Sequence, residues 1–399
     1  MVLNGTAFAQ SSKADSLFVK TQEAYRLGRL DSALMLSQQL MLQDQSKKNY
    51  DYATLSARVN LANGKYQEAE GFIAPFWEEK KPNSEILEIK WGISSSNKKW
   101  DEARKWSDLG VEKFPSDSDT WNWRRTISSF EMRNAHQGLS DWKSFSDSLQ
   151  KTESAQNLKT ELLKQLPRTL AVNWWNAQIN EPQPLPWNLL QLEYGNRATQ
   201  IPWNVRGSFG AFFGQQALQL EGEVYPKLKK NAYGYVHLGL SPSGDLFPNL
   251  RASAEYFKAL PKGEWSVGLK HLRYTALQVS LVTAHAERDF GNAWNVGGRT
   301  YFGVAEKKVF PAQALWLRKN WPLQERWLQA DLQVGQIPYA WIFIPGLEPV
   351  FSVRTGIQAQ IRLNDVFLFR PLLAYEREEY YPNRFRNRLN SQIILQYRF

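Results

Sequence analysis

The stretch RLNSQIILQYRF, residues 388–399, decides the fold of this 399-residue chain. One face of the stretch carries Leu389, Ser391, Ile393, Leu395, Tyr397 and Phe399, and the other carries Arg388, Asn390, Gln392, Gln396 and Arg398. A period of two predicts a β-strand with one apolar and one polar face. A closing strand that ends on an aromatic residue is typical of bacterial outer-membrane barrels. We therefore expect Tyr397 and Phe399 to form the signal that the outer-membrane assembly machinery reads.

The same alternation extends back to residue 167. In residues 352–362, Arg354 and Arg362 fall on one face, while Val353 and Ile361 fall on the other. About fourteen such segments follow one another, starting near residues 169, 187, 201, 215, 231, 249, 263, 277, 292, 309, 325, 350, 365 and 386. Because barrel strands alternate lipid-facing and lumen-facing side chains, residues 167–399 are predicted to form a transmembrane antiparallel barrel of about 12 to 14 strands. The lower number applies if the first two segments, separated by the Pro-rich EPQPLP (181–186), lie partly outside the wall.

The bulk composition agrees with a barrel. No apolar run approaches the roughly 18 residues that a membrane helix needs, and the mean hydropathy is −0.51. The net charge is +10, but the basic residues are dispersed and no nucleic-acid motif accompanies them. Acidic lipopolysaccharide or an anionic polysaccharide is therefore the expected partner, and nucleic acid is not. The absence of cysteine excludes thiol chemistry.

The polar faces define a candidate lumen lining, in which basic residues predominate. Its members are Arg206, Glu221, Glu223, Arg251, Glu255, Lys270, Arg299, Asp331, Arg354, Arg362, Arg388 and Arg398. A positive wall favours an anionic polymer or solute. Interleaved Arg and Glu side chains could equally pair with one another and fill a small barrel, and about fourteen strands lie between a filled and an open interior.

An even strand number places both barrel ends in the periplasm. The outward loops are then expected at 180–186, 241–248, 336–349 and 376–385. Aromatic residues near strand ends are expected in the interfacial girdles, with ordinary core packing as the alternative: Trp187, Trp203, Trp294, Trp316, Trp321 and Trp327.

The front of the chain contains a repeat. YRLGRLDSAL (25–34), LANGKYQEAE (61–70) and SSNKKWDEAR (95–104) align, and this places Ala33, Ala69 and Ala103 at intervals of 36 and 34 residues. The period and pattern resemble the tetratricopeptide repeat, a helix–turn–helix unit that stacks into a solenoid. The predicted packing positions are Gly28, Ala33, Gly64, Tyr66, Ala69, Trp100, Ala103 and Pro115. A fourth copy at 121–149 is degenerate, and 150–166 is predicted to be one more helix.

These observations divide the chain into three parts. Residues 1–9 are interpreted as a residual signal peptide, because Ala7-Phe8-Ala9 before Gln10 fits a signal-peptidase site. Residues 10–166 are predicted to form a periplasmic, tetratricopeptide-like α-solenoid, which would dock a periplasmic protein or serve as a spacer. Residues 167–399 are the predicted outer-membrane barrel.

The rear of the chain resembles the YaiO-type outer-membrane barrel family from residue 187 onward. The resemblance rests on VYPKL (224–228), LFPNLRASAEYFKALPKGEWSVGLKHLRY (246–274), FGNAWNVGGRTYF (290–302) and the closing ILQYRF (394–399). It implies a barrel but no established activity. Repeats joined to a barrel also look like the exporters of cellulose, poly-N-acetylglucosamine and alginate.

The histidines, serines and carboxylates show no pattern typical of catalysis. The four histidines lack metal-ligand spacing, no nucleophile or phosphate-binding motif occurs, and Ser266 and His271 fall on opposite faces of their segment. We therefore predict no enzyme, metal or cofactor. The expected function is a role in exopolysaccharide export. A non-conducting anchor that displays the repeats is the alternative, and an outer-membrane enzyme is a weaker one.

Overall fold

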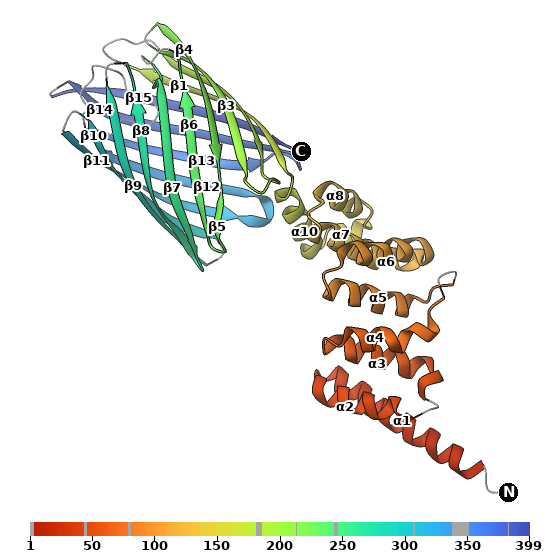
Figure 1. The fold of residues 1–399 in the computed structure, drawn as a ribbon. Coiled ribbons are helices and arrows are strands. Elements are labelled where there is room, and N and C mark those ends of the chain that lie inside the picture. The colour runs from red at the N-terminus through yellow and green to blue at the C-terminus, as the bar shows by residue number, and fades with distance from the viewer. Residues whose placement is uncertain are drawn as a thin grey trace. The chain divides into compact units, whose positions relative to one another are not determined.

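The computed structural model describes residues 4–43, 46–78, 81–180, 186–212, 214–242, 246–275, 277–291, 293–305, 308–336, 351–381 and 383–399. The chain divides into two compact units, Met1–Leu162 and Leu163–Phe399. The first is helical and the second is a closed sheet (Figure 1). The expected loop at 336–349 lies almost wholly outside the described residues. Of the interpreted signal remnant, residues 1–3 also lie outside them, and residues 4–9 belong to the first helix.

The helical unit consists of successive antiparallel helix pairs. Its elements are α1 (Asn4–Arg26), α2 (Leu30–Met41), η1 (Ser46–Lys48), α3 (Tyr50–Ala62), α4 (Tyr66–Ile73), η2 (Ala74–Phe76), α5 (Ser84–Ser96), α6 (Trp100–Lys113), η3 (Pro115–Asp117), α7 (Ser118–Glu131), α8 (Ala135–Lys143), α9 (Asp147–Gln150) and α10 (Glu153–Lys164).

The turn inside each pair has the same backbone conformation. Gly28, Gly64, Lys98 and Arg133 all have positive φ angles, between 56° and 74°. Glycine adopts this conformation without strain, whereas lysine and arginine do so at some cost. The turns lie 36, 34 and 35 residues apart in sequence, so α7 and α8 form the fourth pair of the repeat.

Small residues hold the two helices of each pair together. Ala33, Ala69 and Ala103, each five residues after the turn, are fully buried, and Gly138 occupies the equivalent position in the fourth pair. Tyr66 and Trp100 begin α4 and α6, and Pro115 begins η3 after α6. One apolar cluster joins α1, α2 and α3, and another joins α3, α4 and α5. Each pair therefore buries its apolar face against the next, as in a solenoid.

The second unit contains β1 (Arg168–Ile179), β2 (Trp187–Asn196), β3 (Trp203–Phe212), β4 (Gln215–Val224), β5 (Lys227–Lys229), β6 (Ala232–Leu240), β7 (Leu250–Leu260), β8 (Gly263–Arg273), β9 (Gln278–Phe290), β10 (Trp294–Ala305), β11 (Lys308–Trp321), the turn η4 (Pro322–Gln324), β12 (Arg326–Gly335), β13 (Ser352–Arg362), β14 (Phe367–Tyr381) and β15 (Arg384–Arg398).

Two pairings close the sheet into a ring. Each strand pairs with the next along the chain, except that β4 pairs with β6, because the short β5 is a side ribbon on β6. The last strand, β15, returns to β1, and Arg168 and Phe399 exchange two backbone hydrogen bonds of 2.9 and 3.0 Å. Within the described residues the ring thus contains fourteen antiparallel strands. This confirms the predicted fold, at the upper end of the predicted range and with β1 and β2 inside the wall.

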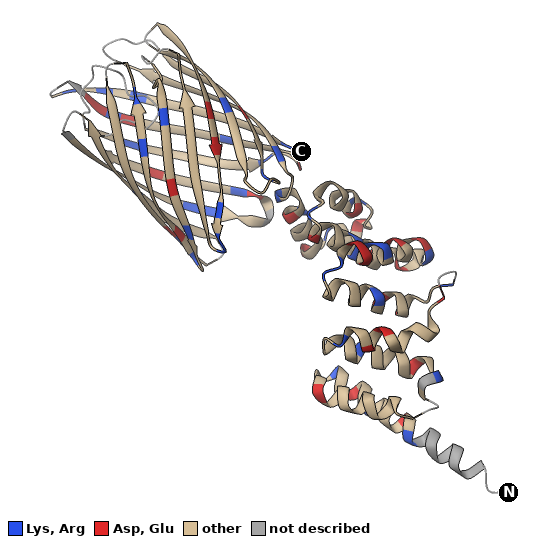
Figure 2. Ribbon diagram, in the orientation of Figure 1, with Lys and Arg blue, Asp and Glu red and all other residues tan. Residues whose placement is uncertain are grey.

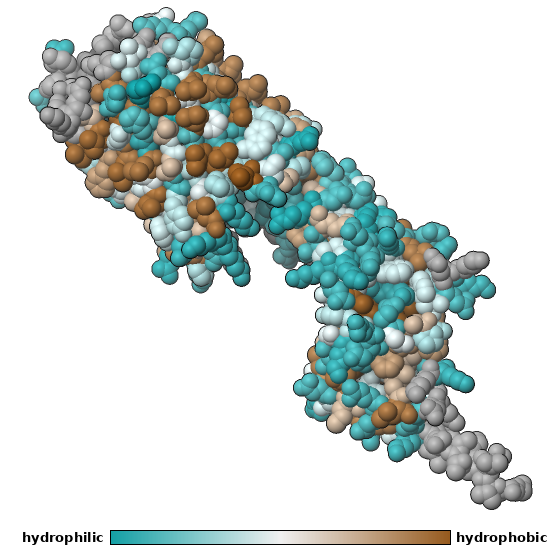
Figure 3. Space-filling model, viewed as in Figure 1, coloured by the Kyte–Doolittle hydropathy of each residue, from teal (hydrophilic) through white to brown (hydrophobic). Residues whose placement is uncertain are grey.

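The two faces of the wall differ in polarity. Along β4, for example, Leu218 and Leu220 are more than 60% exposed on the outside, while Gln219, Glu221 and Glu223 are buried on the inside. Exposed apolar side chains cover much of the outer face seen in Figure 3. Charged residues of both signs are interspersed along the strands (Figure 2). No helix in the described part of the chain is long and apolar enough to cross a membrane.

One expectation about strand ends was wrong, and a second fits only three of its six residues. Residues 376–385 were expected to form a loop, but β14 continues to Tyr381 and β15 begins at Arg384. Paired inward charges on both strands allow the wall to continue there. Of the tryptophans expected in girdles, Trp187, Trp316 and Trp327 have the same parity as inward residues of their strands, and each contacts lumen groups. Trp294 and Trp321 are exposed on the outside, and Trp203 packs on Tyr194 of the outer face.

Candidate functional site

The candidate site is the inward face of the ring. All twelve predicted lumen-lining residues lie on the face opposite to the exposed apolar side chains, and all are buried or partly buried. Period-two alternation places them there, because residues of equal parity on one strand share a face. Most of them form ion pairs, several of which the register creates by placing opposite charges on neighbouring strands.

Arg206 is the centre of the first ion-pair group. Its strand neighbours in register are Glu193 of β2 and Glu221 of β4. The guanidinium lies 2.6 Å from Glu193, 3.5 Å from Glu221 and 3.7 Å from Glu223. Arg251 then contacts Glu221 from β7 at 3.0 Å. Glu221 and Glu223 therefore serve as partners of basic side chains.

A second group lies where β14 and β15 extend beyond their expected ends. Arg388 is in register with Glu376, and its Nη2 lies 2.7 Å from Glu376 and 3.3 Å from Glu378. Arg386 donates a hydrogen bond to Glu378. All four side chains are at most 6% exposed. Removing one charge from such a group leaves its partner buried and uncompensated, which is costly.

The third group gathers around a residue that the sequence analysis did not identify. Glu325 follows η4 in the turn between β11 and β12, with a φ angle of +47°. Its carboxylate accepts hydrogen bonds from Arg398, at 2.7 and 2.9 Å, and from Arg362, at 3.5 Å. No period predicts the direction of a turn residue, so this partner could not be found from alternation. Glu193, Glu376 and Glu378 were missed as well, although their parity placed them inside.

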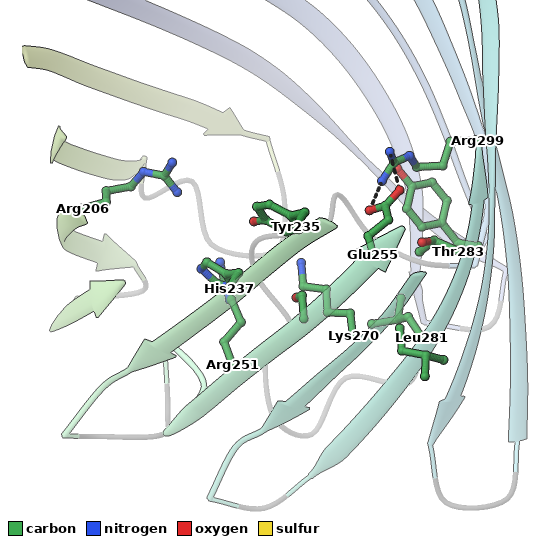
Figure 4. A pocket seen from close by; sticks show the side chains of 12 residues that line it. Arg206, Tyr235, His237, Arg251, Glu255, Lys270, Leu281, Thr283 and Arg299 are labelled. Atoms are coloured by element: carbon green, nitrogen blue, oxygen red, sulfur yellow. Dashed lines mark hydrogen bonds and ion pairs between the residues drawn. The ribbon is translucent and has the colours of Figure 1, made fainter. Parts of the chain in front are cut away.

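The remaining predicted residues are more dispersed. Arg299 of β10 reaches Glu255 of β7 at 3.1 Å, across two intervening strands. Arg354 lies 3.9 Å from Asp331. Lys270 of β8 extends into the lumen and lines the same cavity as Arg299 and Glu255 (Figure 4).

Two cavities lie within the lumen. One, of about 340 Å³, is lined by five amide side chains of β1, β2, β3 and β15, by the charged residues Arg206, Arg370, Glu193 and Glu223, and by Ala171, Tyr225 and Ile394. The other, of about 220 Å³, lies between β3, β6, β7, β8, β9 and β10. It is lined mostly by basic and hydroxyl side chains, together with Glu255, Leu269 and Leu281 (Figure 4). Arg206 contributes to the walls of both.

Apolar side chains fill the end of the lumen where β1 ends and β2 begins. Trp175, Trp187 and Phe212 form a cluster with ring centroids 5.8 to 6.4 Å apart. A separate cluster involves β8 to β11, including Leu281 and Phe310. These clusters narrow the interior toward that rim.

A serine–histidine contact exists, but not the one considered from the sequence. His271 Nδ1 lies 3.0 Å from Ser280 on the neighbouring strand. Ser266 is instead in register with His285, whose Nδ1 is 3.4 Å away. The Ser266 hydroxyl donates a hydrogen bond to the Glu255 carboxylate, and the Ser266 side chain is buried. In this arrangement the hydroxyl proton is not directed at the imidazole, as a nucleophilic serine requires. Within the described residues, no group of His, Asp and Glu side chains could hold a metal ion.

A closed antiparallel ring with an apolar outer face and a polar interior defines the second unit as a membrane β-barrel of the outer-membrane type. The family model described as the YaiO membrane beta barrel domain matches residues 169–340, which include β1 to β12. This match supports the expected resemblance in the barrel and places the protein in the outer membrane. The matched range includes neither the closing ILQYRF nor the helical unit.

Several solved outer-membrane barrels have similar folds. The CymD monoaromatic hydrocarbon channel is 8% identical, with 60% of this chain and 91% of that chain aligned and a TM-score of 0.43. A bacterial polysaccharide outer membrane secretin is 10% identical, with 59% and 99% aligned and a TM-score of 0.43. Omp33 of Acinetobacter baumannii is 12% identical, with 59% and 99% aligned and a TM-score of 0.38. No curated protein sequence matches the chain.

Proposed function

We propose that the barrel passes a hydroxyl-rich polymer through the outer membrane, as a component of exopolysaccharide export. The observation that carries this proposal is a belt of amide side chains across the lumen wall. Gln392 donates to Asn173 at 3.0 Å, Asn173 donates to Gln191 at 2.5 Å, and Gln191 donates to Ser208 at 3.0 Å. We call these four residues the amide belt. They come from β15, β1, β2 and β3, which are consecutive strands of the ring.

The chemistry of the belt suits a sugar chain. An amide both donates and accepts hydrogen bonds, as a sugar hydroxyl does, so the two can exchange partners without leaving either group unsatisfied. The 340 Å³ cavity beside the belt adds Asn204 and Gln396 to the same surface. A neutral, replaceable set of hydrogen bonds allows a polymer to bind and to move on, which conduction requires.

We also propose that the helical unit docks a protein partner in the periplasm. Its support is the stacking of equivalent helix pairs, since solenoids of this kind present extended binding surfaces. The helical unit precedes β1 directly, and Arg168 and Phe399 lie at the same end of the ring. With that end in the periplasm, partner and polymer would meet on the side where the polymer is made.

Single-channel recording tests the transport proposal. The full chain, reconstituted in planar bilayers, is expected to show discrete openings that a neutral oligosaccharide blocks. Gln191→Leu is expected to weaken the block, because it interrupts the amide belt. Gln178→Leu is the matched control, since Gln178 is exposed on the outer face of β1. A wild-type barrel without openings, or a block that Gln191→Leu leaves unchanged, would contradict the proposal.

A second candidate function is a non-conducting anchor for the helical unit. The observation that favours it is the filling of the lumen by the cluster of Trp175, Trp187 and Phe212 and by the ion-pair groups. The same recordings distinguish the two candidates. An anchor gives no openings, while deletion of its helical unit abolishes the recruitment of periplasmic partners.

A further inference from the structure

The smaller cavity, of about 220 Å³, contains a lysine whose position calls for a ligand. Lys270 follows Ser266 and Gly268 on the inward face of β8, and its side chain projects into the cavity (Figure 4). Its neighbours in register are Ser253 on β7 and Leu281 on β9. Neither neighbour carries a charge, so the register supplies Lys270 with no carboxylate.

The other cations around this cavity already have acidic partners. Arg206 is matched by Glu193 and Glu223 on its far side, at 2.6 and 3.7 Å. Arg251 pairs with Glu221 at 3.0 Å.

Arg299 pairs with Glu255 at 3.1 Å. Within the part of the chain that the structure describes, the Lys270 ammonium forms neither a hydrogen bond nor an ion pair. Of the four Lys and Arg side chains that line the cavity, Lys270 is therefore the one whose charged group has no direct partner among the described residues.

A charge in this position is costly unless an anion compensates it. An ammonium group removed from bulk water loses hydration, and protein dipoles or counter-ions must replace it. The cavity wall offers hydroxyl groups from Thr283 and Tyr301 and the guanidinium of Arg299 close to Lys270. All three groups can donate hydrogen bonds, which the coordination of an oxyanion requires.

The size and charge of the cavity restrict the ligand. Ordinary ligand pockets measure about 300 to 1,000 Å³, so a cavity of about 220 Å³ accepts only a small group. Lys270 is the one charged group here without a direct partner among the described residues, and a singly charged carboxylate matches one such group better than a doubly charged phosphate does. A six-membered sugar ring that bears a carboxylate combines these properties, because its hydroxyls can accept from the donors on the wall.

We propose that Lys270, with Arg251 and Arg299 beside it, forms a carboxylate-binding site in the barrel lumen that takes one uronic-acid unit. That this unit belongs to a polymer in transit rests on the proposed function, whereas the site itself does not. The site lies around the ring from the amide belt and shares Arg206 with the belt's cavity. A polymer that alternated neutral and acidic sugars would contact both surfaces.

Thermal unfolding of the detergent-solubilised full chain tests the site without requiring transport. Glucuronate is expected to raise the unfolding midpoint by several degrees, because a ligand that binds only the folded state stabilises it. Glucose, which lacks the carboxylate, is the matched ligand and is expected to have no effect. Lys270→Met is expected to abolish the glucuronate shift, and Lys270→Arg to retain part of it. Lys258→Met, which removes an exposed cation from β7, is expected to leave the shift unchanged.

Several outcomes would overturn the site. They are equal shifts with glucose and glucuronate, no shift in the wild type at high millimolar glucuronate, or a shift that survives Lys270→Met. A larger shift with inorganic phosphate than with glucuronate would overturn the carboxylate assignment. A Lys270-dependent shift in a barrel that shows no openings would retain the site and reject transport. Single-channel openings without any glucuronate shift would reject the site and retain transport.

Discussion

The carboxylate of Glu325 accepts two hydrogen bonds from the guanidinium of Arg398, at 2.7 and 2.9 Å. Glu325 belongs to the turn between β11 and β12, and Arg398 to the strand that closes the ring, three strands away around the wall. Both side chains are at most 7% exposed. Arg398 also donates to the Asp365 carbonyl at 3.0 Å, so one side chain connects two turns at the same rim.

Removing the Glu325 charge is expected to destabilise the barrel near its closure. Glu325→Gln leaves Arg398 and Arg362 without their carboxylate, and the loss of one partner from a buried pair costs about 3 kcal/mol. The measurement is the urea concentration that half-unfolds the barrel in lipid vesicles. Arg326→Gln is the control, because Arg326, the first residue of β12, is exposed. Equal midpoints for both variants would show that the pair does not stabilise the closure.

The helical unit has a buried acid whose protonation should unfold it. Asp141 is 2% exposed and accepts hydrogen bonds from Arg104, at 2.6 Å, and Ser129, at 2.8 Å. Burial alone would raise the pKa of the Asp141 carboxyl, but these hydrogen bonds and the charges of Arg104 and Arg125 outweigh burial and hold the pKa below its usual value. The stabilisation is therefore complete above the ordinary Asp pKa of about 4 and is lost as the pH falls through the lower folded value.

We expect the urea midpoint of the helical circular-dichroism signal to fall between pH 6 and pH 3 in the wild type. Asp141→Asn is expected to lower the midpoint at pH 6, by about 3 kcal/mol in unfolding free energy, and to reduce its dependence on pH. Asp147→Asn, at an exposed position on α9, is the control and should behave as the wild type does. A pH dependence that survives Asp141→Asn undiminished would assign the acid sensitivity to another group.

Two glycines of the helical unit are predicted to respond oppositely to the same change. A Cβ at Gly110 on α6 would lie 2.1 Å from the ring of Trp121 on α7, whose side chain is fully buried. Gly110→Ala is therefore expected to destabilise the helical unit by about 1 to 3 kcal/mol through overpacking. A Cβ at Gly71 on α4 meets nothing within 4 Å.

Gly71→Ala is expected to stabilise the helical unit, by up to about 1 kcal/mol, because alanine loses less backbone entropy in a helix. Urea unfolding followed by circular dichroism measures both variants under one condition. A stabilising Gly110→Ala would mean that α6 and α7 do not pack as closely as the structure has them.

The strands were predictable from the sequence because one period decides both their existence and their faces. All fourteen expected starting points fall within two residues of the first residues of the observed ring strands. The repeat was visible for the same reason, since Ala33, Ala69 and Ala103 recur at a fixed spacing. The fourth pair was degenerate in sequence because Gly138 replaces the alanine and Arg133 replaces the turn glycine.

The partners of the lumen charges could not be predicted, because they depend on register between strands. Alternation places Lys270 inside, but only the pairing of β8 with β7 and β9 shows that its neighbours are Ser253 and Leu281. Glu325 lies in a turn, where alternation does not predict the direction of a side chain. Trp187 was assigned to a girdle because it stands at a strand end, although the parity of Leu189 and Gln191 already indicated the lumen.

Trp187 provides a test of what limits the lumen. Its ring is 1% exposed, packs against Phe212 at a centroid distance of 5.8 Å, and lies 5.0 Å from the Arg388 guanidinium. Trp187→Ala removes one of the two tryptophans of the apolar cluster at this rim, so we expect larger single-channel openings, together with a loss of stability of about 3 to 5 kcal/mol. Trp174 is the matched control, because it is 43% exposed on the outer face of β1. Trp174→Ala should leave the conductance of the barrel unchanged.

If Trp187→Ala opens a barrel that is closed in the wild type, the aromatic cluster is the barrier to conduction. The wild-type protein is then a non-conducting anchor. If both variants conduct as the wild type does, the narrowest part of the lumen lies elsewhere, and the ion pairs of Arg206 with Glu193 and Glu221 become the next group to neutralise.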